Sequence, residues 1–375
     1  MMYGFGIGIS PSNRLFSGGG ANPNFLMTID TTKSGSASNT FILPALNTGT
    51  YDAVIDWGDG NTSNITDYND SDLTHVYSVG GTYQIAIIGS FPNIYFNNGG
   101  DKLKVLSIDN WGLLPFTSFE LSFRGCTNLD ILATDLPDFS VITKMGGAFY
   151  GCTSLNNFPF ANADFSNVTT WVQSGFPAFY GCTSLNNLDF NGMLMNTTTS
   201  YDLFGLFYNC NSLTTITGFN TLDLSKCTSL SDVFRGTSLT SINLSGLDLS
   251  SCTSLLRVFF SVSSLSSLDV TGITLNSTSN INMTQTFSGL GVCDIVGLDT
   301  WNIEKVTTFN SFMSSSTITT TEYDKLLIAW DSQNPVDGLS VNFGTSQYTL
   351  GSASATARAS LISTDLWTIT DGGGI

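Results

Sequence analysis

The sequence predicts a mainly β protein: a solenoid of about nine coils of roughly 26–30 residues, capped by an N-terminal β-sandwich and a small C-terminal α/β cap. Short phrases such as FYGCTSL recur at a nearly constant interval from about residue 103 onward. Apolar and polar residues alternate with a period of two before residue 100. After residue 320 an amphipathic helix is followed by a strand, helix, strand pattern. We therefore expect an arm over 1–25, the sandwich over 26–100, the solenoid over 101–319 and the cap over 320–375.

The composition excludes several classes of partner. The chain carries 12 Lys+Arg against 29 Asp+Glu, a formal net charge of −17. Such an acidic chain without basic runs neutralises few phosphates, so we expect no nucleic acid as partner and no docking on anionic lipid. No run of roughly 18 apolar residues is present, so we expect no membrane insertion. The start of the chain lacks the charged and apolar regions of a signal peptide, so we expect no Sec-type export.

Histidine is scarce, because His75 is the only one in the chain. Histidine-based triads and multi-histidine zinc sites draw on imidazole, so we expect no enzyme, no catalytic residue, no metal and no cofactor. Paired carboxylates need no histidine, and Asp189 and Asp269 share one face of the predicted coils. About three coils separate them, roughly 14 Å at the strand spacing. This exceeds the roughly 6.5–9.5 Å of inverting glycosidases, so hydrolysis of glycosides is disfavoured.

The segment 1–25 is rich in Gly, Ser, Asn and Pro and carries isolated aromatic residues. We predict that it forms an attachment arm in which Tyr3, Phe5 and Phe16 contact a partner. A disordered terminus fits the same composition equally well.

The segment after the arm contains the phrases WGDG (57–60), HVY (75–77) and GTY (81–83). These phrases resemble the signatures of polycystic-kidney-disease-type (PKD) domains, and the resemblance covers about 60 residues and implies an antiparallel β-sandwich. We expect His75 to make a structural hydrogen bond. A cation near Asp56 and Asp59 is a weaker alternative, since two carboxylates fall short of a calcium loop.

The repeats are defined by an apolar anchor that opens each L-x-x-[LI]-x-[LIF] phrase. The anchors are Leu103, Leu129, Leu155, Leu185, Leu213, Leu239, Leu265, Val292 and Ile318. Successive anchors lie roughly 26–30 residues apart, a period that suits one solenoid coil with a short parallel strand.

Each coil carries two further apolar features. A second anchor follows about 13 residues later, and a phenylalanine precedes the first anchor and is expected to stack on its equivalent one coil away. The second anchors are Ile142, Val168, Cys227, Cys252 and Val306. The phenylalanines are Phe123, Phe149, Phe179, Phe207, Phe234, Phe259, Phe287 and Phe312.

The phrases at residues 149–155 and 179–185, both FYGCTSL, resemble the BspA-like bacterial surface branch of leucine-rich repeats. The resemblance spans about 220 residues and implies a leucine-rich-repeat solenoid. Later coils depart from it, since residues 234–237 lose the cysteine.

Four of the seven cysteines lie three residues before successive anchors: Cys126, Cys152, Cys182 and Cys210. Regular spacing at one repeat position favours buried structural thiols over disulfides, and still more over a metal site, since no C-x-x-C pair occurs. Cys293 falls on an outward position of the predicted strand, which predicts an exposed thiol.

Between the anchors, the outward strand positions carry short polar side chains that could hydrogen-bond a glycan or a protein backbone. The candidate ligand-binding residues are Asn156, Asn157, Asn186, Asn187, Asp189, Thr214, Thr215, Thr217, Thr240, Asn243 and Asp269. A solvated face kept polar for solubility explains the pattern equally well. Tyr150, Tyr180 and Tyr208 form a second stripe, for which packing is favoured over sugar stacking.

Two functions from different classes follow. The pairing of a WGDG sandwich with these repeats and a terminal WTITDGG resembles tail-fibre and head-fibre proteins of bacteriophages. This resemblance implies a virion surface protein, released by host lysis, whose arm docks on other virion proteins and whose solenoid meets a host glycan or protein. The alternative is a bacterial cell-surface adhesin. By analogy with fibre proteins, a homo-oligomer is a further expectation.

Overall fold

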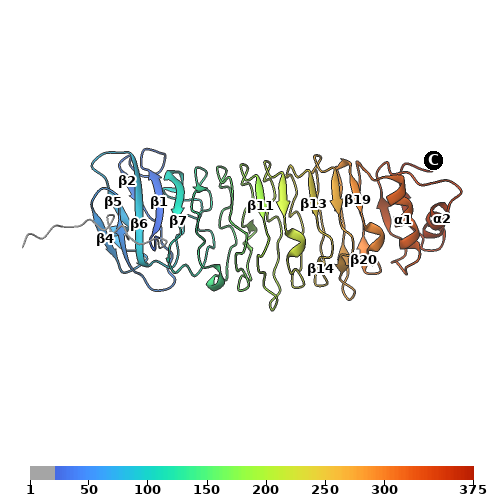
Figure 1. Cartoon of the computed structure of the whole chain (residues 1–375), viewed down its shortest axis with the longest axis horizontal. Coiled ribbons are helices and arrows are strands. Elements are labelled where there is room, and N and C mark those ends of the chain that lie inside the picture. Colours follow the sequence, from blue (N-terminus) through green and yellow to red (C-terminus); the bar gives the residue numbers. More distant parts are fainter. Residues whose placement is uncertain (1–21) are drawn as a thin grey trace, which may run out of the picture.

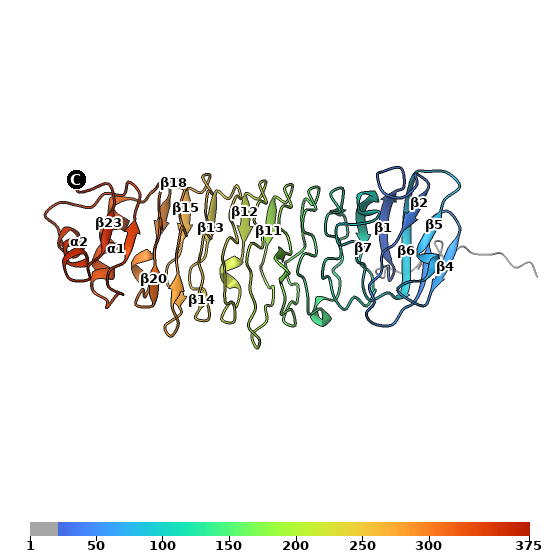
Figure 2. The same cartoon turned by 180° about the vertical axis from the view of Figure 1, so that it is seen from behind.

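The computed structural model describes residues 22–375 as an elongated, mainly β rod with few helices (Figure 1). The chain winds along the rod in order, so that segments close in sequence lie in neighbouring coils, and the view from behind shows the same order (Figure 2). The mainly β class is therefore confirmed. The boundaries between the four predicted segments stay a prediction.

The N-terminal part contains a six-stranded sheet in the order β4-β3-β6-β1-β7-β8 and a two-stranded sheet of β2 and β5. Side chains alternate between buried and half-buried along β1, as the period of two predicted. The strands are β1 (Phe25–Asp30), β2 (Thr40–Ile42), β3 (Asp52–Asp56), β4 (Thr62–Ile65), β5 (Thr74–Val76), β6 (Thr82–Ser90), β7 (Val105–Asn110) and β8 (Asp130–Ile131). Because β7 pairs with β1 on one side and β8 on the other, the sheet runs without interruption into the first coils.

His75 makes the predicted structural hydrogen bond. Its Nε2 lies 2.9 Å from Oδ2 of Asp59, and its ring stacks on Trp57 with centroids 4.9 Å apart. Burial tends to raise the pKa of Asp59, but the hydrogen bonds from His75 and Asn61 outweigh it and hold that pKa below its usual value. The pair therefore ties the WGDG turn to β5.

The coils pair in parallel along two rails. The strand rail begins two residues after the first anchors and comprises two sheets. One contains β11 (Asn187–Asp189) and β12 (Thr215–Thr217), and the other contains β13 (Ser241–Asn243), β15 (Ser267–Asp269) and β19 (Asp294–Val296). The anchor rail carries the second anchors and comprises the bridges Lys144–Thr170, Tyr201–Cys227, Ser229–Ser254 and Ser254–Asn282 with β17 (Ile281–Asn282) and β20 (Val306–Thr308). Further short strands are β9 (Val172–Gln173), β10 (Phe176–Pro177), β14 (Asp248–Leu249), β16 (Thr274–Leu275), β18 (Gly291–Val292) and β21 (Ser316–Thr317).

The predicted column of phenylalanines fills the interior. Phe123, Phe149 and Phe179 stack with centroids 5.5 Å and 5.3 Å apart, and the column continues through Phe207 to Phe312 with neighbouring centroids 5.2–6.3 Å apart. All of these rings are buried. Buried aromatic area of this size makes the column a main source of stability.

The cysteine ladder is made of free, buried thiols, as predicted. The thiol of Cys152 donates to the carbonyl oxygen of Phe123 one coil back, and Cys182 and Cys210 repeat this contact. Burial raises the pKa of these thiols. The cysteine position therefore joins consecutive coils through the small buried side chain that the repeat requires there.

The predicted anchors are wrong at two positions. Leu103 is only half-buried, and Val105 and Ile108 fill the core of that coil. Val292 is 80% exposed, whereas Cys293 beside it is buried, so the prediction of an exposed Cys293 is also wrong. A shift of one residue in a strand exchanges its two faces, and the GLGVCD phrase is shifted in this way relative to the other coils.

The C-terminal helix, strand, helix, strand pattern is confirmed as α1 (Thr320–Asp331), β22 (Ser340–Asn342), α2 (Ala353–Ser363) and β23 (Thr368–Thr370). Leu326, Leu327 and Trp330 are buried on α1, as the pattern predicted. Parallel pairing continues through this segment, since β22 pairs with β23 and Tyr348 bridges Gly374. The segment therefore extends the stacked coils, with helices in place of the irregular return segments (Figure 1).

A left-handed backbone position explains the glycine of the FYG phrase. The residue two positions after the core phenylalanine has a positive φ in seven coils: Gly125, Gly151, Gly181, Asn209, Gly236, Ser261 and Gly289. Its N–H donates to the next coil, as Gly151 does to the carbonyl of Tyr180. Only glycine adopts this conformation without strain.

We expect Gly151→Ala to lower the free energy of unfolding by about 1 kcal/mol, because φ is +73° there although no atom crowds the new methyl group. Ser261→Gly, at the equivalent position with φ +61°, should raise it by about 0.5 kcal/mol. Denaturant unfolding measures both. Gly81→Ala is the control, since Gly81 has no positive φ and is uncrowded. Equal effects of Gly151→Ala and Gly81→Ala would contradict this account.

Candidate functional site

The polar residues predicted for ligand binding lie in a row along the strand rail. Nine of the eleven are exposed, while Asn186 and Asp269 are half-buried. The backbone joins the row from coil to coil, because the amide of Asn186 donates to the carbonyl of Asn156, and Thr214 donates to Asn186 in turn. The row therefore faces outward, as the repeat pattern predicted.

Five of these residues meet at one groove. The groove has a volume of about 370 Å³ and opens between the coil of residues 157–161 and the coil that contains β11. Its polar lining is formed by Asn157, Asn187, Asp189, Thr215 and Thr217. Its apolar lining is formed by Phe158, Pro159, Phe160, Ala161 and Leu188. A small groove with an apolar wall and a few convergent polar groups has the form of a ligand site.

Pro159 explains why the groove opens at this coil. Where the next coil has the strand Asn187–Asp189, residues 157–160 form no strand. Proline has no N–H to donate to a sheet ladder, so the strand rail is interrupted here, and in the described part of the chain β11 pairs with β12 alone. The interior stays filled because Phe160 stacks on Phe190 with centroids 4.7 Å apart. The result is a gap on the surface over a closed core.

Hydrogen bonds hold the polar groups of the groove in place. Asp189 Oδ1 accepts from the backbone N–H of Asn191 at 3.0 Å and from the hydroxyl of Thr217 at 3.1 Å. The hydrogen bond from Asn191 chiefly lowers the pKa of Asp189, so this carboxylate is ionised at neutral pH. The amide of Asn187 donates to Asn186, which donates to Asn156. These bonds pre-orient acceptors and donors along one wall.

The remaining predicted residues are not part of the groove. Thr240, Asn243 and Asp269 lie on later coils, and Asn243 pairs with Asp269 in the sheet of β13, β15 and β19. The residues that sequence reasoning missed are the apolar ones, chiefly Phe158 to Ala161. The signal was present in the sequence, because NNFPF stands at residues 156–160 where the next coil has NNLDF.

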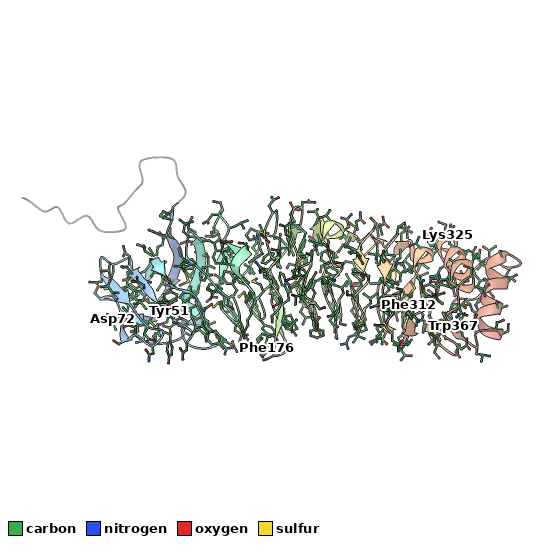
Figure 3. The ribbon with its side chains drawn as sticks, turned by 90° about the horizontal axis from the view of Figure 1, so that it is seen from below. Tyr51, Asp72, Phe176, Phe312, Lys325 and Trp367 are labelled. Carbon is green, nitrogen blue, oxygen red and sulfur yellow. The ribbon has the colours of Figure 1, made fainter. Side chains whose placement is uncertain are left out.

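The tyrosine stripe is occupied by its own packing. Tyr150 and Tyr180 stack with centroids 4.6 Å apart, and Tyr208 packs edge-on against Tyr180 at 4.9 Å. The guanidinium of Arg124 lies 3.7 Å from the ring centroid of Phe176, which also contacts Tyr150. Figure 3 shows Phe176 at one edge of the rod. Because these rings cover one another's faces, the preference for packing is confirmed for this stripe.

Three other features considered in the sequence are the arm, a metal site and a membrane-spanning segment. Tyr3, Phe5 and Phe16 of the arm lie outside the described residues. Within residues 22–375, no group of three or more Asp, Glu, His or Cys side chains is arranged to hold a metal ion, near Asp56 and Asp59 or elsewhere. In the same residues, no helix has the length and apolar character needed to cross a membrane.

The coils and the polar row define a repeat-containing, mainly β protein, and this class is compatible with a surface protein. The family model described as "Mycoplasma protein of unknown function, DUF285" matches residues 117–245 and 201–325, together more than half of the chain. The chain belongs to this family. No curated protein matches it significantly. No solved structure does so either.

Proposed function

We propose that this protein is a non-enzymatic adhesion protein that recognises a surface glycan through the groove on its strand rail. The observation that carries the proposal is the convergence of five polar residues and an apolar wall at the interruption made by Pro159. Amide, carboxylate and hydroxyl groups exchange hydrogen bonds with sugar hydroxyls, while the apolar wall receives the C–H face of a pyranose ring. A host protein that presents an extended backbone is the other partner with this chemistry.

The proposal includes the fold family of the coils and the location of the protein. Parallel pairing from coil to coil and the FYGCTSL phrases support a leucine-rich-repeat solenoid of the BspA-like type, and the WGDG, HVY and GTY phrases support a PKD-like N-terminal sandwich. On this view the protein is a tail-fibre or head-fibre protein of a bacteriophage, with residues 1–25 docked on the particle. The alternative, a bacterial cell-surface adhesin, is supported by the description of the matching family, which refers to a cellular organism.

We expect Thr215→Trp to abolish glycan binding. Thr215 is exposed and lines the groove, so an indole there fills the space that a sugar would occupy, and tryptophan is well accepted in strands. Binding of the full chain to an immobilised array of bacterial surface glycans should fall at least tenfold. Ser241→Trp is the matched control, because Ser241 is exposed on the same rail outside the groove.

Two results would count against the proposal. Unchanged array binding by Thr215→Trp would remove the groove as the site. Mass spectrometry of purified phage particles and of bacterial envelopes addresses the location separately. The chain should be found in particles, and its detection only in envelopes would replace the virion by the cell surface.

A further inference from the structure

A second groove opens between the same two coils, on the anchor rail. It has a volume of about 400 Å³ and is lined by Thr169, Thr170, Trp171 and Val172 of one coil, by Ser200, Tyr201 and Asp202 of the next, and by Thr228. Its size falls within the range of roughly 300–1,000 Å³ for small-molecule sites. Hydroxyl groups dominate its lining, in contrast to the apolar wall of the first groove.

The long repeat explains this groove. The interval from Leu155 to Leu185 is longer than that between any other pair of successive anchors, and this repeat contains the hairpin of β9 and β10 that turns at Ser174 and Gly175. The anchor rail bridges Lys144 to Thr170 and then Tyr201 to Cys227, with no bridge joining Thr170 to the coil of Tyr201 in the described part of the chain. This repeat therefore lacks both a strand at residues 157–160 and a bridge from Thr170 to the next coil, and a groove lies at each place.

One residue of the lining, Trp171, carries a buried polar group without a hydrogen-bond partner in the described part of the chain. The indole Nε1 of Trp171 makes no hydrogen bond within residues 22–375, although the side chain is almost fully buried. An unpaired buried polar group costs free energy unless water or a ligand satisfies it, and such a group in a native structure calls for an explanation. Because Trp171 lines the groove, its indole also reports on a ligand bound there.

We propose that this groove is a second saccharide site that binds a neutral sugar unit through its hydroxyls. The groove offers hydroxyl groups, which both donate and accept, and the carboxylate of Asp202, which accepts from sugar hydroxyls. No cationic side chain lines it, so an anionic sugar has no counter-charge there. Two sites on different rails of one rod allow simultaneous contact with two glycan chains, which strengthens attachment by multivalency. This proposal extends the proposed function but concerns a separate site.

The test uses the full chain labelled with ¹⁵N at its tryptophan side chains and a panel of neutral trisaccharides: maltotriose, cellotriose, mannotriose and chitotriose. Each is added up to about 10 mM, which detects dissociation constants in the millimolar range. Trp171 is the reporter, and Trp171→Phe assigns its indole resonance. We expect at least one trisaccharide to shift this resonance saturably.

Ser200→Phe should weaken that binding at least tenfold, because Ser200 is exposed and its replacement occupies the groove. Thr170→Gln is the second blocking variant and should act in the same direction. Thr253→Phe is the matched control, since Thr253 is exposed on the anchor rail one coil beyond Thr228 and outside the groove. Circular dichroism checks that each variant is folded.

The outcomes separate this site from the first groove. Loss of binding in Ser200→Phe and Thr170→Gln, with retention in Thr253→Phe and Thr215→Trp, supports the second site. No saturable shift of Trp171 in the unmodified chain, or unchanged binding in both blocking variants, overturns it. Loss only in Thr215→Trp likewise overturns the second site while supporting the proposed function.

Discussion

Phe179→Ala is expected to lower the free energy of unfolding by about 3–5 kcal/mol, the usual cost of removing a buried phenylalanine ring. Phe179 is fully buried. It contacts the rings of Phe149, Phe158, Phe160 and Phe207, at centroid distances of 4.8–5.9 Å. The neighbouring rings are fixed by their own coils, so the cavity can close only in part. Urea unfolding followed by circular dichroism measures the loss.

The matched control is Phe260→Ala. Phe260 is half-buried and lies one position after the core phenylalanine of its coil, so its removal should cost less than about 1 kcal/mol. In a stack in which each coil contacts only its neighbours, the Phe179 variant should also lose stability first around residues 149–207. Hydrogen exchange that shows uniform weakening along the rod, or equal costs for the two variants, would contradict the stacked column.

Lys104→Met is expected to cost a similar amount, about 3–5 kcal/mol, because it leaves the buried carboxylate of Asp101 without its cation. Lys104 and Asp101 are both buried, with Nζ 3.6 Å from Oδ1. Nζ also lies within hydrogen-bond distance of Ser36 Oγ and of the carbonyl oxygens of Ala37 and Thr40. Asp101 in turn accepts from the backbone N–H groups of Ser36 and Ile42. The pair fastens the loop before β2 to the first coil.

Lys102→Met provides the comparison for this prediction. Lys102 lies in the same short helix, the 3₁₀ turn Lys102–Lys104, but its amino group contacts Asn98 near the surface, so its loss should cost less than about 0.5 kcal/mol. Thermal unfolding of the two variants side by side distinguishes the roles. If both lysine variants unfold at the same temperature, the buried pair does not hold the N-terminal part to the coils.

The repeated features were predictable because equivalent positions have the same packing environment in every coil. A phenylalanine that recurs once in every coil predicts a column of rings, and Phe123 to Phe312 form it. The cysteine ladder and the buried face of α1 were predictable for the same reason, since both follow a regular spacing. Where the repeat slips by one residue, as at Val292 and Cys293, alignment by interval placed the two side chains on the wrong faces.

The polar row was also visible in the sequence, but the residues that come together were not. Thr215 and Ser241 occupy equivalent places in their phrases, yet only Thr215 lines the groove. The difference comes from Pro159, which lies two coils before Thr215. The coil of Pro159 forms no strand beside β11, and the groove opens there. Likewise, the long interval from Leu155 to Leu185 indicated additional residues but not the second groove that they open.

By itself, the sequence determined the repeating interior of this protein, because hydrophobic burial at a fixed period admits few arrangements other than stacking. Only the tertiary structure decided where the stack is interrupted and which charges are buried. Asp101 and Lys104 look like ordinary surface residues in the sequence, and their burial follows from the distant loop at residues 36–40, which folds over them. Grooves and buried ion pairs arise from contacts between segments, which a one-dimensional pattern does not contain.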